Sequence, residues 1–297
     1  MNKTLLTTDL DLPVVHRGKV RDIYALDDKL LMITTDRLSA FDVVFNEGIS
    51  GKGRILNAVS LFWAQQLPAC QPFHLITDDV REMGPLVAKH ADKLAGHALL
   101  VEKLDMLPVE CVVRGHLVGS GWKDYQRTGE VCGHHLPKGM QQGQAFDQPI
   151  FTPATKAAVG DHDENISYDE MVKLVGASAA KELRQRSMEI FTAGTAFAQQ
   201  RGLILVDTKF EFGRRQDGTL VLADEVLTPD SSRYWDAAQT RATPVGETPP
   251  SFDKQIVRDY LETLDWNKAP PPPALPADIL ESAAARYAEL LARLTQS

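Results

Sequence analysis

The chain has 297 residues, of which 43% are hydrophobic and 24% charged, and its formal net charge is −8 at pH 7. This length and composition suit one large globular domain or two ordinary ones. The negative charge argues against a nucleic-acid partner, because affinity for a phosphate backbone comes from lysine and arginine. An anionic small molecule would need only a local cluster of cations.

The spacing of the cysteines and the length of the apolar stretches predict the cellular compartment of the protein. Cys70, Cys111 and Cys132 lack CxxC spacing, so neither a disulfide framework nor a thiolate zinc site is expected. No stretch of about 18 consecutive apolar residues occurs, and the polar segment 1–12 does not resemble a signal peptide. We therefore expect a cytoplasmic protein with no membrane partner, present as a monomer or a small homo-oligomer.

The first part of the chain has the pattern of a β-rich unit. Strand-like alternation recurs in three runs, which predicts an antiparallel meander over residues 13–17, 20–25 and 30–35. Apolar residues at helical spacing predict a helix from about 54 to 67. Further strand-like runs follow at 74–77 and 98–104, and Leu107-Pro108 suggests the boundary between two lobes.

The second part mixes strands and helices. A strand is predicted at 109–118, and the Gly-, Gln- and Pro-rich segment 133–155 is predicted to be a long loop. Ser167 and Glu170 form a capping-box pattern that opens a helix. The later predicted elements are a helix at 179–200, a hairpin of 203–213 with 219–227, and a helix at 251–264.

Proline and helical periodicity mark the end of the chain. Pro270 to Pro273 predict a stiff extended spacer, after which a helix is expected from 277 to 294. We predict an α+β chain with a β-rich N-terminal lobe, an α+β lobe, and a Pro-rich linker with a C-terminal helix that packs on the body. The predicted ranges are 1–107, 108–266 and 267–297.

The segment from Asp207 to Glu211 carries the strongest chemical signal. The period-2 alternation of a strand places Asp207, Lys209 and Glu211 on one face. If the opposite face packs on the core, the charged face must line a solvated cleft or be neutralised by ligands. The alternative is an exposed edge strand with surface ion pairs.

Two acidic residues interrupt the partner strand of the predicted hairpin. Asp224 and Glu225 follow an apolar run, and the hairpin brings one of them close to the charged face. A few carboxylates, completed by phosphate oxygens and water, are the usual ligands of Mg²⁺ at a nucleotide site. We predict Glu211 and Asp224 as those ligands.

Several basic segments could bind phosphate. Gly18, Lys19 and Arg21 lie at a strand turn that could hold ATP phosphates, and the alternative is a plain β-turn with solvated charges. Arg114 and Ser120 flank a turn of small residues before a helix, which suits an anion, and the alternative is a capped helix with a surface arginine.

A second turn repeats this pattern and adds further candidates for substrate binding. It contains Asp230, Ser231 and Arg233. The other candidates are Ser39, Asp42 and Lys254, although each alone is more often a cap or a surface residue. The acidic run 160–165 could hold a cation, but a solvated loop is the favoured interpretation.

Seven ordered segments closely resemble the signature segments of the phosphoribosylaminoimidazole-succinocarboxamide synthase (SAICAR synthetase) family. They span residues from about 14 to 264 and read GKVRDIY, TDRLSAFD, PVECVVRGHLVGSGWKDY, GDHDENIS, VDTKFEFG, ADEVLTPDSSRYW and SFDKQIVRDYL. The resemblance implies a two-lobed ATP-binding fold, comparable to kinases and ATP-grasp enzymes, with a β-rich lid over ATP.

The resemblance also implies roles for particular residues. The phosphate-contacting lysine falls on Lys19, the adenine-side hinge on Glu102 to Leu104, and the magnesium carboxylates on Glu211 and Asp224. The residues that would bind the ribotide are Arg114, Ser120, Asp207, Arg233 and Lys254.

The implied activity is ATP-dependent ligation of L-aspartate to carboxyaminoimidazole ribotide in purine biosynthesis. The imidazole carboxylate would attack the γ-phosphate, and the aspartate amine would displace the resulting acyl phosphate. Lys209 could neutralise charge during phosphoryl transfer, and Asp207 could accept the amine proton. Two alternatives are a small-molecule kinase, which would not depend on aspartate, and a non-catalytic nucleotide sensor, which would be expected to lack Lys19, Glu211 or Asp224.

Overall fold

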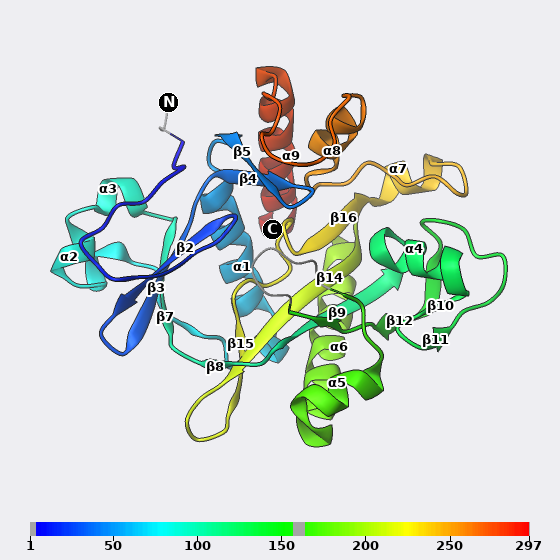
Figure 1. Ribbon diagram of the computed structural model, residues 1–297, viewed down its shortest axis with the longest axis horizontal. Helices are drawn as coiled ribbons and strands as arrows, with labels where there is room; N and C mark the ends of the chain where they lie inside the picture. Colours follow the sequence, from blue (N-terminus) through cyan, green and yellow to red (C-terminus); the bar gives the residue numbers. More distant parts are fainter. Residues whose placement is uncertain (1–3, 157–163, 297) are drawn as a thin grey trace.

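The computed structural model describes residues 4–156 and 164–296. Two β-sheets lie side by side, one built by the first hundred residues and one by the rest, and helices pack against both (Figure 1). This mixture confirms the α+β class. Among the described residues, no helix is long and apolar enough to cross a membrane.

The N-terminal sheet is five-stranded and antiparallel, with strand order β1-β2-β3-β7-β6. Its strands are β1 (Val14–Arg17), β2 (Arg21–Leu26), β3 (Lys29–Thr34), β6 (Leu75–Thr77) and β7 (Ala98–Glu102). The first three strands confirm the predicted meander. The short helices α2 (Pro85–Ala88) and α3 (Ala91–Leu94) pack over one face of this sheet, and β4 (Arg37–Ala40) pairs with β5 (Val43–Gly48) in a separate ribbon.

The second sheet is seven-stranded, with β12, β9, β14 and β15 in order and β8, β13 and β16 attached. Its strands are β8 (Asp105–Met106), β9 (Val109–His116), β12 (Ala145–Phe151), β13 (Ala154–Thr155), β14 (Leu203–Arg214), β15 (Leu220–Ala223) and β16 (Ser232–Asp236). β14 is the central strand and pairs with β9, β15 and β16. The predicted hairpin is therefore confirmed. The lobe boundaries stay a prediction, although β8 joins this sheet just before Leu107.

The prediction of a long loop over 133–155 was wrong. Strand β12 pairs antiparallel with β9, with Ile150 opposite Arg114, and the short strands β10 (Glu130–Val131) and β11 (His134–His135) form a hairpin. The strand forms through a tertiary contact and not through a local sequence pattern. The backbone amides and carbonyls of β9 need hydrogen-bond partners, and the backbone of this segment supplies them although its side chains alternate only weakly. An irregularity in the register between Ala145 and Ile150 also obscures the alternation.

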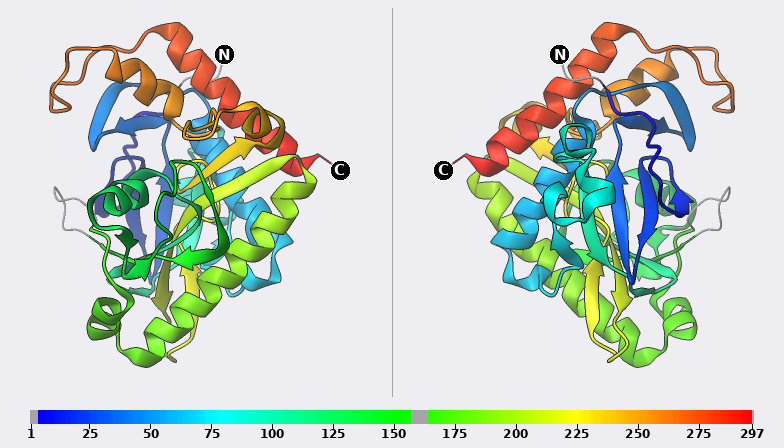
Figure 2. Two further views of the ribbon diagram at one scale, coloured as in Figure 1. Left: turned by 90° about the vertical axis from the view of Figure 1, so that its right-hand side faces the viewer. Right: turned by 90° about the vertical axis from the view of Figure 1, so that its left-hand side faces the viewer.

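The long helices cover the second sheet, and α6 (Ala177–Gln200) crosses its face while α9 (Ala277–Thr295) runs along one end of the molecule (Figure 2). The main hydrophobic core joins α1 (Lys52–Gln66) and α6 to the apolar face of β14. The other helices are α4 (Gly119–Thr128), α5 (Tyr168–Val175), α7 (Ala237–Ala242) and α8 (Gln255–Glu262).

The start of α5 was predicted correctly from the sequence, whereas the start of α8 was not. The capping box of α5 is present, since Ser167 accepts from the Glu170 amide at 3.2 Å and Glu170 accepts from the Ser167 amide at 2.8 Å. The helix predicted over 251–264 is shorter, because Ser251 forms a β-bridge with Trp235 and α8 begins only at Gln255.

Arg186 of α6 fixes the segment that leads to His74. Its guanidinium donates to backbone carbonyls of the segment 69–72 and of Leu220, at distances from 2.8 to 3.3 Å. The Pro72 carbonyl also accepts from the Leu222 amide at 3.0 Å, and Leu220 belongs to β15, so the arginine ties the segment 69–72 to the edge of the second sheet.

Replacing this arginine should destabilise the fold. We expect Arg186→Leu to lower the free energy of unfolding by about 3 kcal/mol, because four partly buried carbonyls lose a charged donor. The measurement is urea denaturation. The matched control is Arg184→Leu, on an exposed arginine that lies over the Tyr168 ring with 5.5 Å between guanidinium carbon and ring centroid, where a loss below about 1 kcal/mol is expected. Equal losses in both variants would contradict this account.

Two buried histidines and one half-buried histidine should make stability depend on pH. Burial lowers the pKa of His74, His97 and His116, to about 4 for His74. An unfolded histidine takes up a proton near pH 6.5, so below that pH the unfolded chain binds more protons and the free energy of unfolding falls as pH drops towards 4. His74 alone should contribute a loss of about 2 kcal/mol at pH 5.

The variant His74→Gln removes this titration. Chemical denaturation at pH 7 and pH 5 should show a smaller loss of stability for the variant than for the natural protein, by about 2 kcal/mol. An identical loss in both would mean that His74 does not titrate as its burial requires.

Candidate active site

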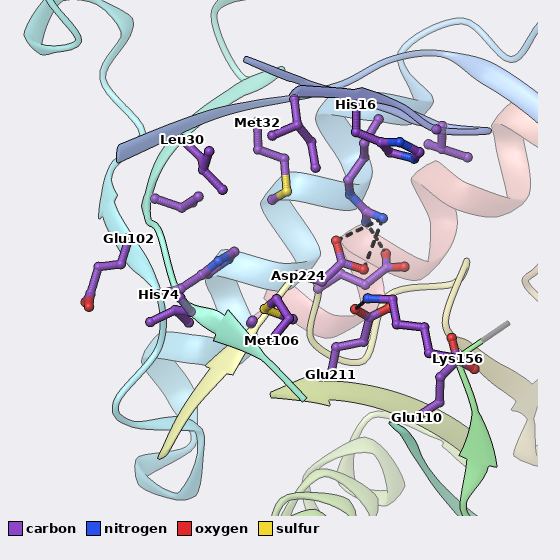
Figure 3. Close-up of a pocket in the computed structure, with 18 of the residues that line it drawn as sticks. His16, Leu30, Met32, His74, Glu102, Met106, Glu110, Lys156, Glu211 and Asp224 are labelled. Atoms are coloured by element: carbon purple, nitrogen blue, oxygen red, sulfur yellow. Dashed lines mark hydrogen bonds and ion pairs between the residues drawn. The ribbon is translucent and has the colours of Figure 1, made fainter. Parts of the chain in front are cut away.

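A cavity of about 490 Å³ lies between the two sheets, and we call it the large cavity. Leu30 and Met32 of the N-terminal sheet face Glu211 and Asp224 of the second sheet across it (Figure 3). Leu30 lies towards one end of the cavity, whereas Lys156 and Glu211 lie towards the other, which we call the charged end (Figure 3). The cavity therefore suits a ligand with a flat apolar part and an anionic part.

The residues predicted to bind the nucleotide all line the large cavity. They are Gly18, Lys19, Arg21, Glu102, Leu104, Glu211 and Asp224. The Gly18 amide donates to the Arg21 carbonyl at 2.7 Å, which makes the tight turn between β1 and β2. Glu102 forms a two-bond ion pair with Arg215, with both distances 2.7 Å, and this contact was not predicted.

Glu211 and Asp224 come together because their strands pair. Glu211 lies opposite Ala223 in the β14–β15 ladder, and Asp224 follows directly with a left-handed φ of 61°. A non-glycine residue in that conformation is uncommon outside functional sites and turns. Arg21 from the N-terminal sheet contacts Asp224 at 3.2 Å and Glu225 at 2.6 Å, so one cation connects the two sheets at this point.

The pKa values of the two carboxyls diverge. Burial raises the pKa of Asp224 to about 6, and the neighbouring Glu211 and Glu225 add to this against the effect of Arg21. Burial would also raise the pKa of Glu211, but Lys209 and Lys156 more than offset it and the pKa falls below its usual value. Among the described residues, no group of three or more His, Cys, Asp or Glu forms a metal site, so a cation here would have few protein ligands.

Lys209 connects the large cavity to a second one. It lines both the large cavity and a smaller one of about 180 Å³, which we call the small cavity. Its ammonium group pairs with Glu110 and lies 3.8 Å from Glu211. Burial alone would lower the pKa of Lys209, but Glu110 and Glu211 raise it by a larger amount. The net shift of the pKa is therefore upward, and the side chain stays cationic.

A row of three charged residues forms the wall of the small cavity. Asp207 of β14 lies opposite Arg114 of β9 on one side and opposite Arg233 of β16 on the other. Its Oδ2 accepts from Arg114 at 3.3 Å and also from Arg233. Arg114 donates to the Ser120 hydroxyl at 2.8 Å, and this fixes its orientation at the start of α4.

Gly119 makes room for one of these arginines. A Cβ atom built on Gly119 would lie 2.7 Å from Nη2 of Arg233, and its φ of 58° is left-handed. The glycine is therefore required both by its backbone conformation and by the close approach of the guanidinium.

The remaining predicted residues divide into two groups. Asp230 and Ser231 line the small cavity with Arg114, Ser120, Asp207 and Arg233. Ser39, Asp42 and Lys254 are not among the residues that line either cavity. Ser39 is buried in β4, Asp42 pairs with Lys19, and Lys254 lies 3.5 Å from Asp230.

Sequence reasoning missed two residues at the charged end of the large cavity. Glu110 holds Lys209, and Lys156 contacts Glu211 at 2.5 Å. A signal existed for Glu110, since it is an isolated acidic residue in an apolar strand, whereas Lys156 has no distinguishing pattern. Of the acidic run 160–165, residues 160–163 lie outside the described residues, and Asn165 donates to Asp124 at 2.7 Å.

Comparison with known proteins supports one family. The family model described as SAICAR synthetase matches residues 14–273. Proteins named phosphoribosylaminoimidazole-succinocarboxamide synthase from Thioalkalivibrio sulfidiphilus and Xanthomonas campestris pv. campestris are 52% and 51% identical to the chain, cover 99% of it, and are themselves covered over 99% and 97%.

Solved structures agree with these relatives. The SAICAR synthase from Saccharomyces cerevisiae complexed with SAICAR is 38% identical, with a TM-score of 0.89 and 99% coverage of both chains. A SAICAR synthetase in complex with ADP is 26% identical, with a TM-score of 0.67 and coverage of 95% of this chain and 97% of its own. This chain belongs to the SAICAR synthetase family, whose members are ATP-dependent ligases of purine biosynthesis.

Proposed function

We propose that the chain joins L-aspartate to carboxyaminoimidazole ribotide, with ATP in the large cavity and the ribotide in the small cavity. The observation that carries this assignment is the shared residue Lys209, which lines both cavities. Two anionic reactants would then meet at a half-buried cation. Holding reacting groups next to each other in this way is a major part of the catalysis of phosphoryl transfer.

The large cavity fits ATP by its polarity. Apolar side chains such as Leu30, Met32 and Met106 suit an adenine ring, while Lys19 and Arg21 also line the cavity and Arg21 contacts Asp224. Family membership supports ATP as the nucleotide, and the relative solved with ADP has the same fold. The turn at Gly18, closed by its amide hydrogen bond to the Arg21 carbonyl, places Lys19 at the wall of the large cavity.

Glu211 and Asp224 would hold Mg²⁺. Two hard carboxylate ligands fit that ion, because magnesium usually completes its shell with phosphate oxygens and water. Arg21 contacts Asp224 and Lys156 contacts Glu211, so both carboxylates already lie beside positive charge, which supports a cation at this position. Magnesium at this position would supply charge neutralisation for the γ-phosphate.

The residues of the small cavity would bind and orient the ribotide. Arg114, Arg233, Ser120 and Ser231 form a concave donor set that suits a phosphate group. The imidazole carboxylate would attack the γ-phosphorus of ATP, releasing ADP and forming an acyl phosphate. The aspartate amine would then displace phosphate and lose one proton, leaving an amide. Lys209 would stay protonated throughout and stabilise the charge on the transferring phosphoryl group.

The role of Asp207 follows from its contacts. Its Oδ2 accepts from Arg114 and from Arg233, so the carboxylate is engaged in orienting two cations. A proton acceptor for the amine needs a carboxylate oxygen open to the substrate. The contacts therefore favour a role in holding the two arginines, and the assignment of Asp207 as the general base stays a prediction. A cytoplasmic location and a monomer or small homo-oligomer stay predictions as well.

Aspartate dependence separates the proposal from a small-molecule kinase on the same fold. With ATP, Mg²⁺ and carboxyaminoimidazole ribotide, we expect the purified protein to release ADP at least about 100-fold faster when L-aspartate is present, because amide formation consumes the activated carboxylate. A coupled ADP assay and product absorbance would follow the reaction. ADP release that does not respond to aspartate would favour the kinase.

The proposed magnesium ligand can be tested by charge removal. Glu211→Gln should lower kcat at least about 100-fold and raise the Mg²⁺ concentration needed for half-maximal rate, because one anionic ligand becomes a neutral amide. The control is Glu182→Gln, on an exposed residue that pairs with Arg214 and lines neither cavity. Normal magnesium dependence in Glu211→Gln would rule out its role as a ligand.

A further inference from the structure

The carboxylate of Asp230 is held by donors from three distant parts of the chain. The Tyr287 hydroxyl of α9 donates to Oδ1 at 2.7 Å, and the Lys52 ammonium of α1 donates to Oδ2 at 2.6 Å. Lys254, at the start of α8, lies 3.5 Å from the same Oδ2. The Lys52 side chain is 0% exposed and Asp230 6%, so these contacts form in a dry environment where a missing partner is costly.

Helix α9 therefore reaches a wall of the small cavity. It lies beyond the part of the chain, 14–273, that matches the family model, and it packs against α1 and α8 (Figures 1 and 2). Tyr287 is fully buried in this packing. A helix needed only to cover a hydrophobic surface would have no reason to bury a tyrosine hydroxyl against a carboxylate.

The turn that carries Asp230 transmits its position to both cavities. The Ser231 and Ser232 amides donate to the Thr228 carbonyl at 3.2 and 2.8 Å, which closes the turn. The Lys209 amide donates to the Ser231 carbonyl at 3.0 Å. A shift of the Asp230 carboxylate would therefore move Ser231, which lines the small cavity, and the backbone of Lys209.

The contacts at Asp230 divide between its two oxygens. Lys52 and Lys254 contact Oδ2 at 2.6 and 3.5 Å, and the Tyr287 hydroxyl donates to Oδ1. Without that hydroxyl, Oδ1 would lose this donor, and the carboxylate could turn and shift the residues of the turn that follow it.

We propose that Tyr287 is a positioning residue of the ribotide site, acting through Asp230 to orient the turn at Ser231. This inference rests on the proposed function, in which the small cavity holds the ribotide. It makes the C-terminal helix part of the active-site structure.

The test is Tyr287→Phe, which removes only the hydroxyl. We expect the KM for carboxyaminoimidazole ribotide to rise about threefold to tenfold, the effect of losing one hydrogen bond, while kcat and the KM for ATP stay within about twofold. The matched control is Tyr24→Phe, since Tyr24 is also fully buried and its hydroxyl lies 2.7 Å from that of Thr8 in the N-terminal lobe. This control should leave the KM for the ribotide unchanged.

A double-variant cycle separates positioning from general destabilisation. In an Asp230→Asn background, Tyr287→Phe should raise the KM for the ribotide by less than about twofold, because the group through which it acts has already been altered. Fully additive effects, or an unchanged KM in Tyr287→Phe alone, would overturn the inference. A Tyr287→Phe protein with reduced thermal stability but unchanged affinities would also do so.

Direct binding distinguishes this inference from the proposed function. If the natural protein fails to turn over the ribotide, the proposed reaction is wrong, whatever Tyr287 does. Calorimetric titration with ribose 5-phosphate then still tests the anion site, and Tyr287→Phe should bind it about threefold to tenfold more weakly than the natural protein. Equal binding by both proteins would overturn the positioning role.

Discussion

Three alternate positions of β14 carry charge in a largely buried strand, and the site depends on compensating each of those charges. Asp207 lies between Arg114 and Arg233, Lys209 pairs with Glu110, and Glu211 pairs with Lys156. An unpaired charge at such positions would cost several kcal/mol, so the strand can form only together with its partners. The pairing of β14 with β9 and β16 therefore builds the sheet and the site in one step.

The other face of β14 explains why these charges are held in place. Phe210 and Phe212 point into the main hydrophobic core, where α1 and α6 pack against them. Because the alternation of a strand is strict, fixing these rings also fixes Lys209 and Glu211 on the opposite face. Rigid placement matters for phosphoryl transfer, in which positioning and charge stabilisation supply most of the catalysis.

The elements that could be predicted from sequence are those with local signals. The meander of 13–35, the capping box at Ser167 and the alternating charges of β14 all depend on neighbours in sequence, and the structure confirms them. Strand β12 could not be predicted, because it forms through pairing with β9 across about thirty residues. The same reason applies to Lys156 and Tyr287, whose partners Glu211 and Asp230 are far away in the chain.

The net charge of −8 is compatible with two anionic substrates because the cations of the site are held by acidic residues of the same chain. Lys19 pairs with Asp42, Lys156 with Glu211, and Lys254 lies near Asp230. Such pairs orient the cations before a ligand arrives, so a ligand meets a formed set of donors. Their carboxylates also limit the attraction of other anions, because each cation is only partly available. An arginine or lysine cluster without these partners would bind any phosphate compound more strongly, so the acidic partners favour ligands that can engage several donors at once.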